Sequence, residues 1–222
     1  MNVARLNYEG NPHIGLFIFC NDKLCLIGSG FQEDQQQDIH RALGVPLYVV
    51  KVFGSNLIGL FVTGNNKGIV VPDMIEEVEF KQLSEICSKH DMTVTKIKSR
   101  LNALGNSLLC NDHGCIANPE FGTEEKREIS HGLQVPVHSG TIASFQTVGS
   151  LARAANRGIL VAEDILPEEQ EVIEKTLNSK TVTGTINNSP YISSGLVANH
   201  KGYAISDQLF GGEVLSIKDA FF

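Results

Sequence analysis

Residues 59–72, with the sequence GLFVTGNNKGIVVP, decide the fold of this chain. An apolar run comes first, and Asn65-Asn66-Lys67-Gly68 follows with residue types that tolerate a positive φ angle. A second apolar run then ends at Pro72. Two β-prone runs joined by such a turn predict a β-hairpin.

Four related stretches occur elsewhere in the chain. They read GLFIFCNDKLCLIG from Gly15, GNSLLCNDHGCIANP from Gly105, GSLARAANRGILVAE from Gly149 and SSGLVANHKGYAISD from Ser193. The five starting positions are 44, 46, 44 and 44 residues apart. The turn positions have the same spacings; they are Leu24, Gly68, Gly114, Gly158 and Gly202. Two independent landmarks therefore define one five-fold internal repeat that fills the chain.

Each repeat also contains a helix and a third strand. After the hairpin of the second repeat, Phe80, Leu83 and Ile86 recur at helical spacing, and acidic residues occupy the first turn. Residues 93–98 then alternate like a half-exposed strand. The helical pattern returns at 35–43, 124–133, 167–177 and 213–221, and third strands are predicted at 45–47 and 135–137. The predicted unit is strand, strand, helix, strand.

The fifth unit lacks its last strand, because the sequence ends after the fifth predicted helix. Residues 3–6 are apolar enough to supply this strand, which would close the ring and remove two open sheet edges. We therefore expect an α/β fold, a five-bladed propeller in which residues 1–222 form a single domain. The strands that begin at the repeated glycines should lie nearest the axis, with Ser193 as the small substitute in the fifth blade.

Composition limits the classes of function. The chain has 222 residues, of which 42% are apolar and 19% charged, with a formal net charge of −7. This balance is typical of a globular protein and argues against a broad basic surface for nucleic acid. The N-terminal residues do not resemble a secretion signal, and no apolar run is long enough to span a membrane. We expect a cytoplasmic protein without membrane contact.

Four of the five cysteines occur as two equivalent pairs. Cys20 and Cys25 flank one turn, and Cys110 and Cys115 flank the turn 90 residues later. Four thiols at such spacing resemble zinc ligands, but equivalent buried strand positions explain them without a metal. No phosphate-binding loop, dinucleotide fingerprint or hydrolase signature occurs, so we expect no metal, no cofactor and no catalytic residues.

Polar residues gather in two kinds of segment. Asparagines recur in the turns, where tolerance of left-handed backbone explains them; these are Asn21, Asn65, Asn111, Asn156 and Asn199. The loops before the glycine positions, at 56–59, 101–106 and 146–150, carry amides and small residues and should converge on one end of the propeller. Protein recognition at that end and simple packing of the channel mouth remain equally good readings. We interpret the acidic residues Glu168, Glu169 and Glu171 as side chains that complement the helix dipole and form part of the solvent-exposed face of a helix.

Three motifs resemble the translation initiation factor six family, the ribosome anti-association factors of archaea and eukaryotes. They are Leu-Asn-Ala-Leu-Gly-Asn at 101–106 with the following Cys-Asn-Asp, Thr-Val-Gly-Ser at 147–150, and Gly-Asn-Asn-Lys-Gly-Ile-Val-Val-Pro at 64–72. The similarity covers nearly all 222 residues, including the repeat register. The absence of an extended tail after Phe222 resembles the archaeal form of the family.

The resemblance implies a pentein fold, which is a five-bladed α/β propeller. It also implies binding to the large ribosomal subunit, through a ribosomal protein near the sarcin-ricin loop with limited rRNA contact, and steric exclusion of the small subunit. The implied ribosome-binding residues are Leu104, Gly105, Asn106, Leu60, Ser150 and Ser193. A monomer is expected. Leu24 and Ser193 depart from the glycines of the other repeats.

Two alternatives stand beside this interpretation. Guanidine-modifying penteins use a cysteine nucleophile from their last repeat, but here no cysteine follows Cys115. Repeats of 44 to 46 residues also leave no room for a long active-site lid. The other alternative is a propeller that serves as a scaffold for a different protein partner.

Overall fold

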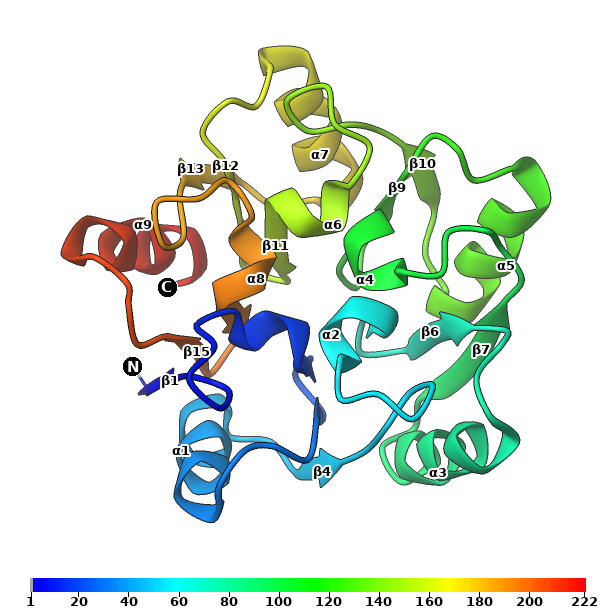
Figure 1. Cartoon of the computed structure of the whole chain (residues 1–222). Helices are drawn as coiled ribbons and strands as arrows, with labels where there is room; N and C mark the ends of the chain where they lie inside the picture. Colours follow the sequence, from blue (N-terminus) through cyan, green and yellow to red (C-terminus); the bar gives the residue numbers. More distant parts are fainter. Residues whose placement is uncertain (1) are drawn as a thin grey trace.

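Five three-stranded sheets surround a central axis in the computed structural model, which describes residues 2–222 (Figure 1). Each sheet is one blade. In every blade the inner and middle strands form an antiparallel hairpin, and the outer strand pairs in parallel with the middle one. The predicted five-bladed α/β propeller is confirmed.

The strands, from inner to outer, are as follows. The first blade contains β2 (Ile18–Cys20), β3 (Cys25–Ile27) and β4 (Leu47–Val49). The second contains β5 (Thr63–Gly64), β6 (Gly68–Pro72) and β7 (Thr93–Ile97). The third contains β8 (Leu108–Cys110), β9 (Cys115–Ala117) and β10 (Val137–Ser139). The fourth contains β11 (Ala152–Ala155), β12 (Gly158–Ala162) and β13 (Thr181–Gly184). The fifth contains β14 (Leu196–Ala198), β15 (Gly202–Ser206) and β1 (Asn2–Leu6).

Five long helices cover the outside of the ring (Figure 1). They are α1 (Glu33–Leu43), α3 (Glu77–Ser88), α5 (Thr123–Leu133), α7 (Pro167–Leu177) and α9 (Gly211–Phe221). Each buries its apolar stripe between two neighbouring blades; Ile39 and Leu43 of α1, for example, share a core cluster with Ala204 of the fifth blade. All five helices lie where the sequence periodicity predicts them.

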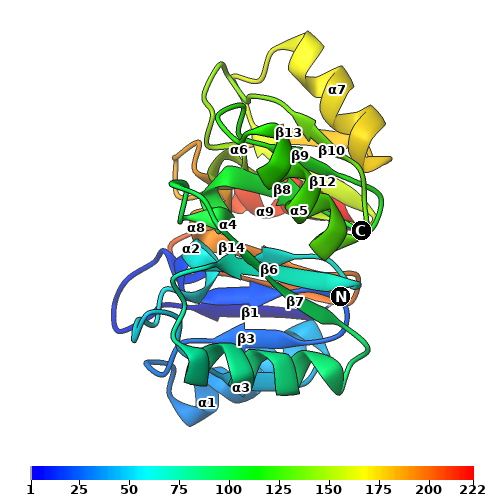
Figure 2. The same ribbon diagram turned by 90° about the vertical axis from the view of Figure 1, so that its right-hand side faces the viewer.

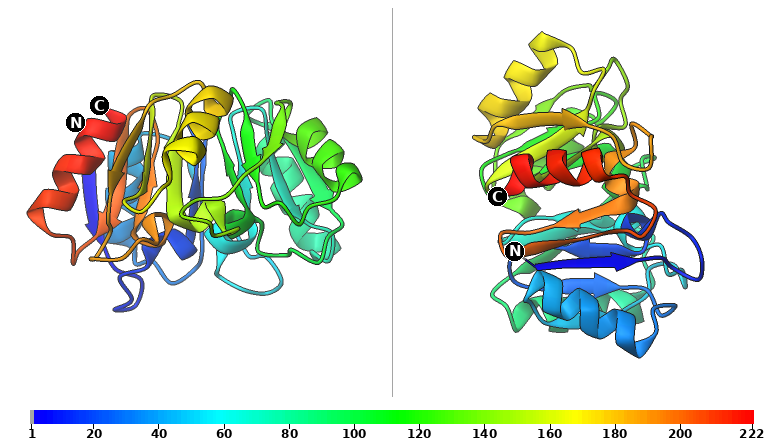
Figure 3. Two further views of the ribbon diagram at one scale, coloured as in Figure 1. Left: turned by 90° about the horizontal axis from the view of Figure 1, so that it is seen from above. Right: turned by 90° about the vertical axis from the view of Figure 1, so that its left-hand side faces the viewer.

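The N-terminal strand closes the ring as the sequence predicted. β1 pairs in parallel with β15, and the register places Val3 opposite Tyr203 and Leu6 opposite Ser206. The chain termini therefore lie near each other, beside the fifth blade (Figure 3). This pairing satisfies the backbone groups at the edge of β15, which would otherwise be free to pair with another chain.

The prediction that strands begin at the repeated glycines is wrong. The glycines lie in short helical turns that precede the inner strands; these turns are η1 (Ile14–Leu16), α2 (Ile58–Phe61), α4 (Leu104–Ser107), α6 (Val148–Leu151) and α8 (Ile192–Gly195). In the second blade the inner strand contains only Thr63 and Gly64, whereas the apolar run that begins at Gly59 predicts a longer strand. A single helical turn is too short to leave a periodic signal in the sequence.

The two ends of the axis differ. Figure 2 shows the short helical turns at one end and both termini at the other. We call the first the helical-turn end. The second, where the hairpins reverse direction, is the hairpin end.

Candidate functional site at the axis

At the hairpin end, four polar residues form a closed hydrogen-bonded ring around the axis, and a fifth, His200, joins it through Asp22. We call them the turn ring: Asp22, Asn66, Asp112, Asn156 and His200, one from each blade. The Asn66 amide donates to Asp22 at 2.8 Å and to Asp112 at 2.7 Å. The Asn156 amide donates to the same two carboxylates, at 3.0 and 2.6 Å. Alternating amides and carboxylates thus satisfy one another across the axis.

The Asp22 carboxylate also holds the fifth blade. One of its oxygens accepts the His200 backbone N–H at 2.9 Å and lies 2.7 Å from the imidazole Nδ1 of the same residue. Burial raises the pKa of Asp22, but the hydrogen bonds from His200 and Asn66 and the nearby imidazole together lower it by more. The pKa of Asp22 therefore lies below its ordinary value.

The explanation of the turn asparagines by left-handed backbone is wrong. Positive φ angles among the described residues occur elsewhere, not at these asparagines. The Asn65 Oδ1 instead accepts the backbone N–H groups of Lys67 and Gly68, and its Nδ2 donates to the carbonyls of Asn111 and Leu133 in the next repeat. Each such side chain fixes its own turn and joins it to the neighbouring blade.

The structure also corrects the register in the fourth repeat. Asn156 belongs to the turn ring, one position after the blade-joining asparagines. Ala155 stands where the other repeats have Asn21, Asn65, Asn111 and Asn199. The blade-joining side chain is therefore missing from one of the five repeats, and repeat spacing from Gly158 would have revealed this.

At the helical-turn end, the five short turns touch through their backbones. A Cβ atom on Gly105 would lie 2.0 Å from the Gly59 carbonyl oxygen, so only glycine fits there. Ser193 takes the equivalent place in the fifth blade, and its hydroxyl donates to the Ala152 carbonyl at 2.7 Å. This contact accommodates the one departure from glycine.

Below these turns lies an axial cavity of about 250 Å³. Gly105, Asn106, Ser150 and Ser193, four of the residues that the sequence analysis proposed for binding, line it together. We call five exposed or partly exposed residues of its lining, which lie in or next to the short turns, the mouth: Asn106, Ser150, Tyr191, Ser193 and Ser194.

The other two proposed residues lie apart from the mouth. Leu104 is completely buried in a core cluster, so its side chain does not reach the surface and supports the turn from below. Leu60 is partly exposed on α2 outside the cavity lining. Sequence reasoning missed Tyr191, which is 53% exposed beside Ser193, and Arg153, which points into the cavity. The sequence did offer a signal for Tyr191, because an aromatic residue stands directly before the segment that forms α8.

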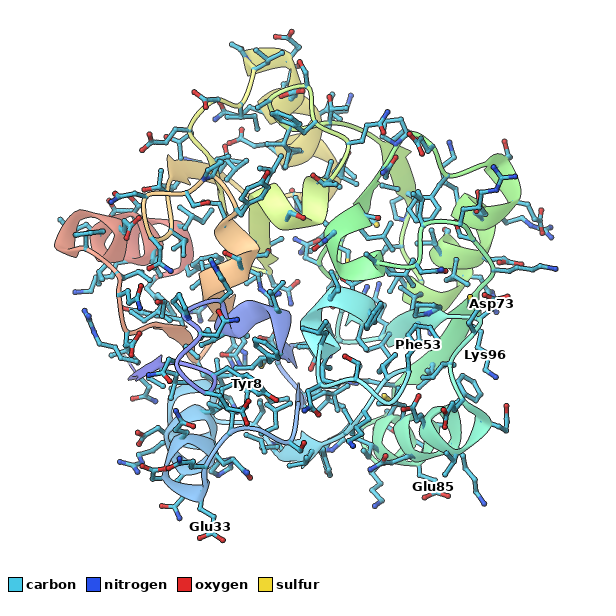
Figure 4. The ribbon with its side chains drawn as sticks, in the orientation of Figure 1. Tyr8, Glu33, Phe53, Asp73, Glu85 and Lys96 are labelled. Carbon is cyan, nitrogen blue, oxygen red and sulfur yellow. The ribbon has the colours of Figure 1, made fainter. Side chains whose placement is uncertain are left out.

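Buried and partly buried aromatic residues anchor the loops that lead to the first two turns. Tyr8 stacks on Phe17 with ring centroids 3.7 Å apart, and Phe53 packs edge-on against Phe61 at 5.0 Å. Figure 4 labels Tyr8 and Phe53 in these loops. The turns at the helical-turn end are thus held from behind by aromatic pairs.

A helix carboxylate braces the same loop in three blades. Glu79 of α3 accepts the backbone N–H groups of Phe53 and Gly54, both at 2.8 Å. Glu169 and Glu213 make equivalent contacts in the fourth and fifth blades. These contacts fix the loops that present the short turns.

The sequence interpretation of Glu168, Glu169 and Glu171 is therefore incomplete. Glu169 does more than complement the helix dipole, because its carboxylate accepts hydrogen bonds from the Thr141 hydroxyl and the Ser144 backbone N–H. Burial raises the pKa of Glu169, but these hydrogen bonds lower it by more, so the pKa lies below its ordinary value.

The paired cysteines lie where the spacing predicts them. Cys20 faces Cys25 across the first hairpin, and Cys110 faces Cys115 across the third. All four are buried, with free thiols. Within residues 2–222, no group of three His, Cys, Asp or Glu side chains is arranged to hold a metal ion. None of the helices in the same range is long and apolar enough to cross a bilayer.

The fold is similar to a known solved structure. A mutant of DDAH from Pseudomonas aeruginosa, complexed with citrulline, superposes with a TM-score of 0.53 over 82% of this chain and 71% of that one, at 11% identity. At so low an identity the similarity concerns the fold alone, and it supports the predicted pentein architecture.

The sequence also matches one protein family over almost its whole length. Residues 3–220 match the eIF-6 family. Translation initiation factor 6 from Saccharolobus islandicus is 35% identical, over 99% of each chain. The same factor from Staphylothermus marinus is 33% identical, over 98% of this chain and 96% of the relative. These relatives are named as translation factors, which decides against the guanidine-modifying enzyme. The chain belongs to the eIF-6 family of translation initiation factors.

Proposed function

We propose that this factor binds the large ribosomal subunit through its helical-turn end and so keeps the small subunit from joining. The observation that carries the proposal is the match to the eIF-6 family over residues 3–220. The mechanism is steric. No bond is made or broken, and a rigid body of this size occupies the surface that the small subunit needs.

The chemistry of the mouth supports this assignment. Asn106 and Ser150 present uncharged polar groups, and Tyr191 adds an exposed aromatic ring. Interface centres are depleted in charge and enriched in tyrosine. An interface of ordinary size covers about 800 Å² on each partner, a small part of the 9556 Å² accessible surface of the molecule.

The same features indicate the kind of partner. With a net charge of −7, the chain suits a basic ribosomal protein better than an extended RNA surface. We propose contact with a large-subunit protein near the sarcin-ricin loop, limited contact with rRNA, and action as a single-domain monomer in the cytoplasm. Gly105, Asn106, Ser150 and Ser193 form the proposed contact, with Leu60 at its margin and Leu104 supporting it from the core.

Sucrose-gradient sedimentation with purified archaeal subunits tests the proposal. The protein is expected to co-sediment with large subunits, to be absent from small subunits, and to decrease the fraction of joined ribosomes as its concentration rises. No change in that fraction at excess protein would contradict the anti-association role. Binding to a protein other than the ribosome would favour the scaffold alternative.

The variant Asn106→Ser tests the binding end. It removes an amide from the mouth and is expected to weaken large-subunit binding about tenfold, the equivalent of about 1.4 kcal/mol. The matched control is Gln37→Ser, an exposed amide on the outer face of α1. The control should bind like the unmodified protein. Equal affinities for both variants would remove Asn106 from the interface.

A further inference from the structure

A single arginine crosses the axial cavity. Arg153 projects from β11 of the fourth blade, and its Nη2 donates to the Cys20 carbonyl in the first blade at 3.2 Å. Its Nε is inaccessible to solvent and has no hydrogen-bond partner in the protein. The Nε–H donor of the guanidinium therefore has no partner among the described residues.

No acidic side chain neutralises this arginine. Among the described residues that line the cavity, Arg153 is the only charged one. Asp22 and Asp112 line an adjoining, smaller cavity of about 30 Å³ at the hairpin end, but they are already bound by the amides of the turn ring. Burial lowers the pKa of Arg153, which expresses the unfavourable environment for its charge. Buried charges in proteins are normally paired.

The walls of the cavity suit an anion. Thr63 contributes a hydroxyl group to the lining, and the small residues Gly64 and Ala154 line the same cavity. A volume of about 250 Å³ exceeds that of several water molecules at about 30 Å³ each. A tetrahedral oxyanion with a few waters fits this space, and the mouth offers it a way in.

We propose that the axial cavity is a binding site for a small tetrahedral oxyanion of the phosphate or sulfate type, held by the Arg153 guanidinium. The planar fork of arginine matches two oxygens of such an anion. The site lies beneath the mouth and does not depend on the proposed ribosome contact. Its test uses the isolated protein, so it stands or fails separately.

Thermal unfolding of the full chain measures the binding. Phosphate or sulfate is added to the protein in sodium chloride at constant ionic strength. At about ten times the dissociation constant, the midpoint is expected to rise by roughly 4 °C for a chain of this size. Isothermal titration calorimetry should give one site per chain. No rise at tens of millimolar of either anion would overturn the proposal.

Two substitutions locate the site. Arg153→Met is expected to abolish the rise, whereas Arg157→Met, an exposed arginine at the end of the same hairpin, should keep it. An equal rise in Arg153→Met would place the anion elsewhere and overturn the assignment. If Arg153→Met fails to fold, Arg153→Lys keeps the charge but loses the fork, and binding at least tenfold weaker is expected. Unchanged affinity in Arg153→Lys would also overturn the proposal.

Discussion

The hairpin end and the helical-turn end join the same five blades by different chemistry. At the hairpin end, side-chain amides and carboxylates bond across the axis, as Asn66 does with Asp22 and Asp112. At the helical-turn end, backbones meet directly, as at Gly59 and Gly105. The polar side chains of the hairpin end are thus committed to folding. At the mouth, the Ser193 and Ser194 hydroxyls are also bonded within the protein, whereas the Asn106 and Ser150 side chains have no such bond among the described residues.

Lysines strengthen the hairpin end further. The Lys67 Nζ donates to the Gln134 carbonyl at 3.1 Å, and the Lys201 Nζ donates to the Gly44 carbonyl at 2.7 Å. Gln134 and Gly44 cap the C-termini of the helices in the next repeat. An ammonium group there satisfies free carbonyls and complements the helix dipole. The mouth has no equivalent of these contacts among the described residues.

The largest effect is expected from breaking a backbone contact at the helical-turn end. In Gly105→Ala the new methyl would lie 2.0 Å from the Gly59 carbonyl oxygen, and backbone cannot move aside cheaply. We expect a loss of at least about 3 kcal/mol in the free energy of unfolding, measured by urea denaturation. The control is Gly212→Ala, where nothing lies within 4 Å. A loss as small as that of the control would mean that the ring of turns is loosely packed.

A somewhat smaller effect is expected from Asn65→Ala at the hairpin end. The substitution leaves the buried carbonyls of Asn111 and Leu133 and two backbone N–H groups without their partner. We expect a loss of about 2 kcal/mol in the free energy of unfolding. Gln37→Ala, on an exposed helix face, should change it by less than about 0.5 kcal/mol. Equal stability of the two variants would show that the hairpin end is not held by these amides.

The smallest effect concerns acid. Because the folded pKa of Asp22 is lowered, its contribution to stability is full above the ordinary carboxylate pKa of about 3.9 and is lost as pH falls through the folded value. Asp22→Asn replaces one of the two acceptor oxygens by an NH₂ group, which cannot accept the donors on that side, so the variant should be less stable at pH 7. The stability difference from the unmodified protein should narrow as pH falls below about 4, measured by urea denaturation across pH. A stability difference that does not change with pH would show that the ionised Asp22 carboxylate is not its cause.

Parts of the fold and of the candidate site could be predicted from the sequence, and other parts could not. Hairpins and helices have local signals, such as the spacing of Phe80, Leu83 and Ile86, and these predictions are confirmed. The role of Asn65 depends on Asn111 and Leu133, which are 46 and 68 residues away. A local reading therefore assigned it to its own turn only. Leu104 shows the same limit of local prediction. Its motif indicated a binding residue, but the side chain is buried by contacts with the neighbouring blade.

The sequence by itself determined the number of blades, the order of elements within each and the closure by the N-terminal strand, because a repeated pattern must bury the same face five times. Only the tertiary structure decided which end is sealed and which is open. That difference arises where side chains from separate repeats meet at the axis, and contacts between distant residues leave no periodic trace in the chain.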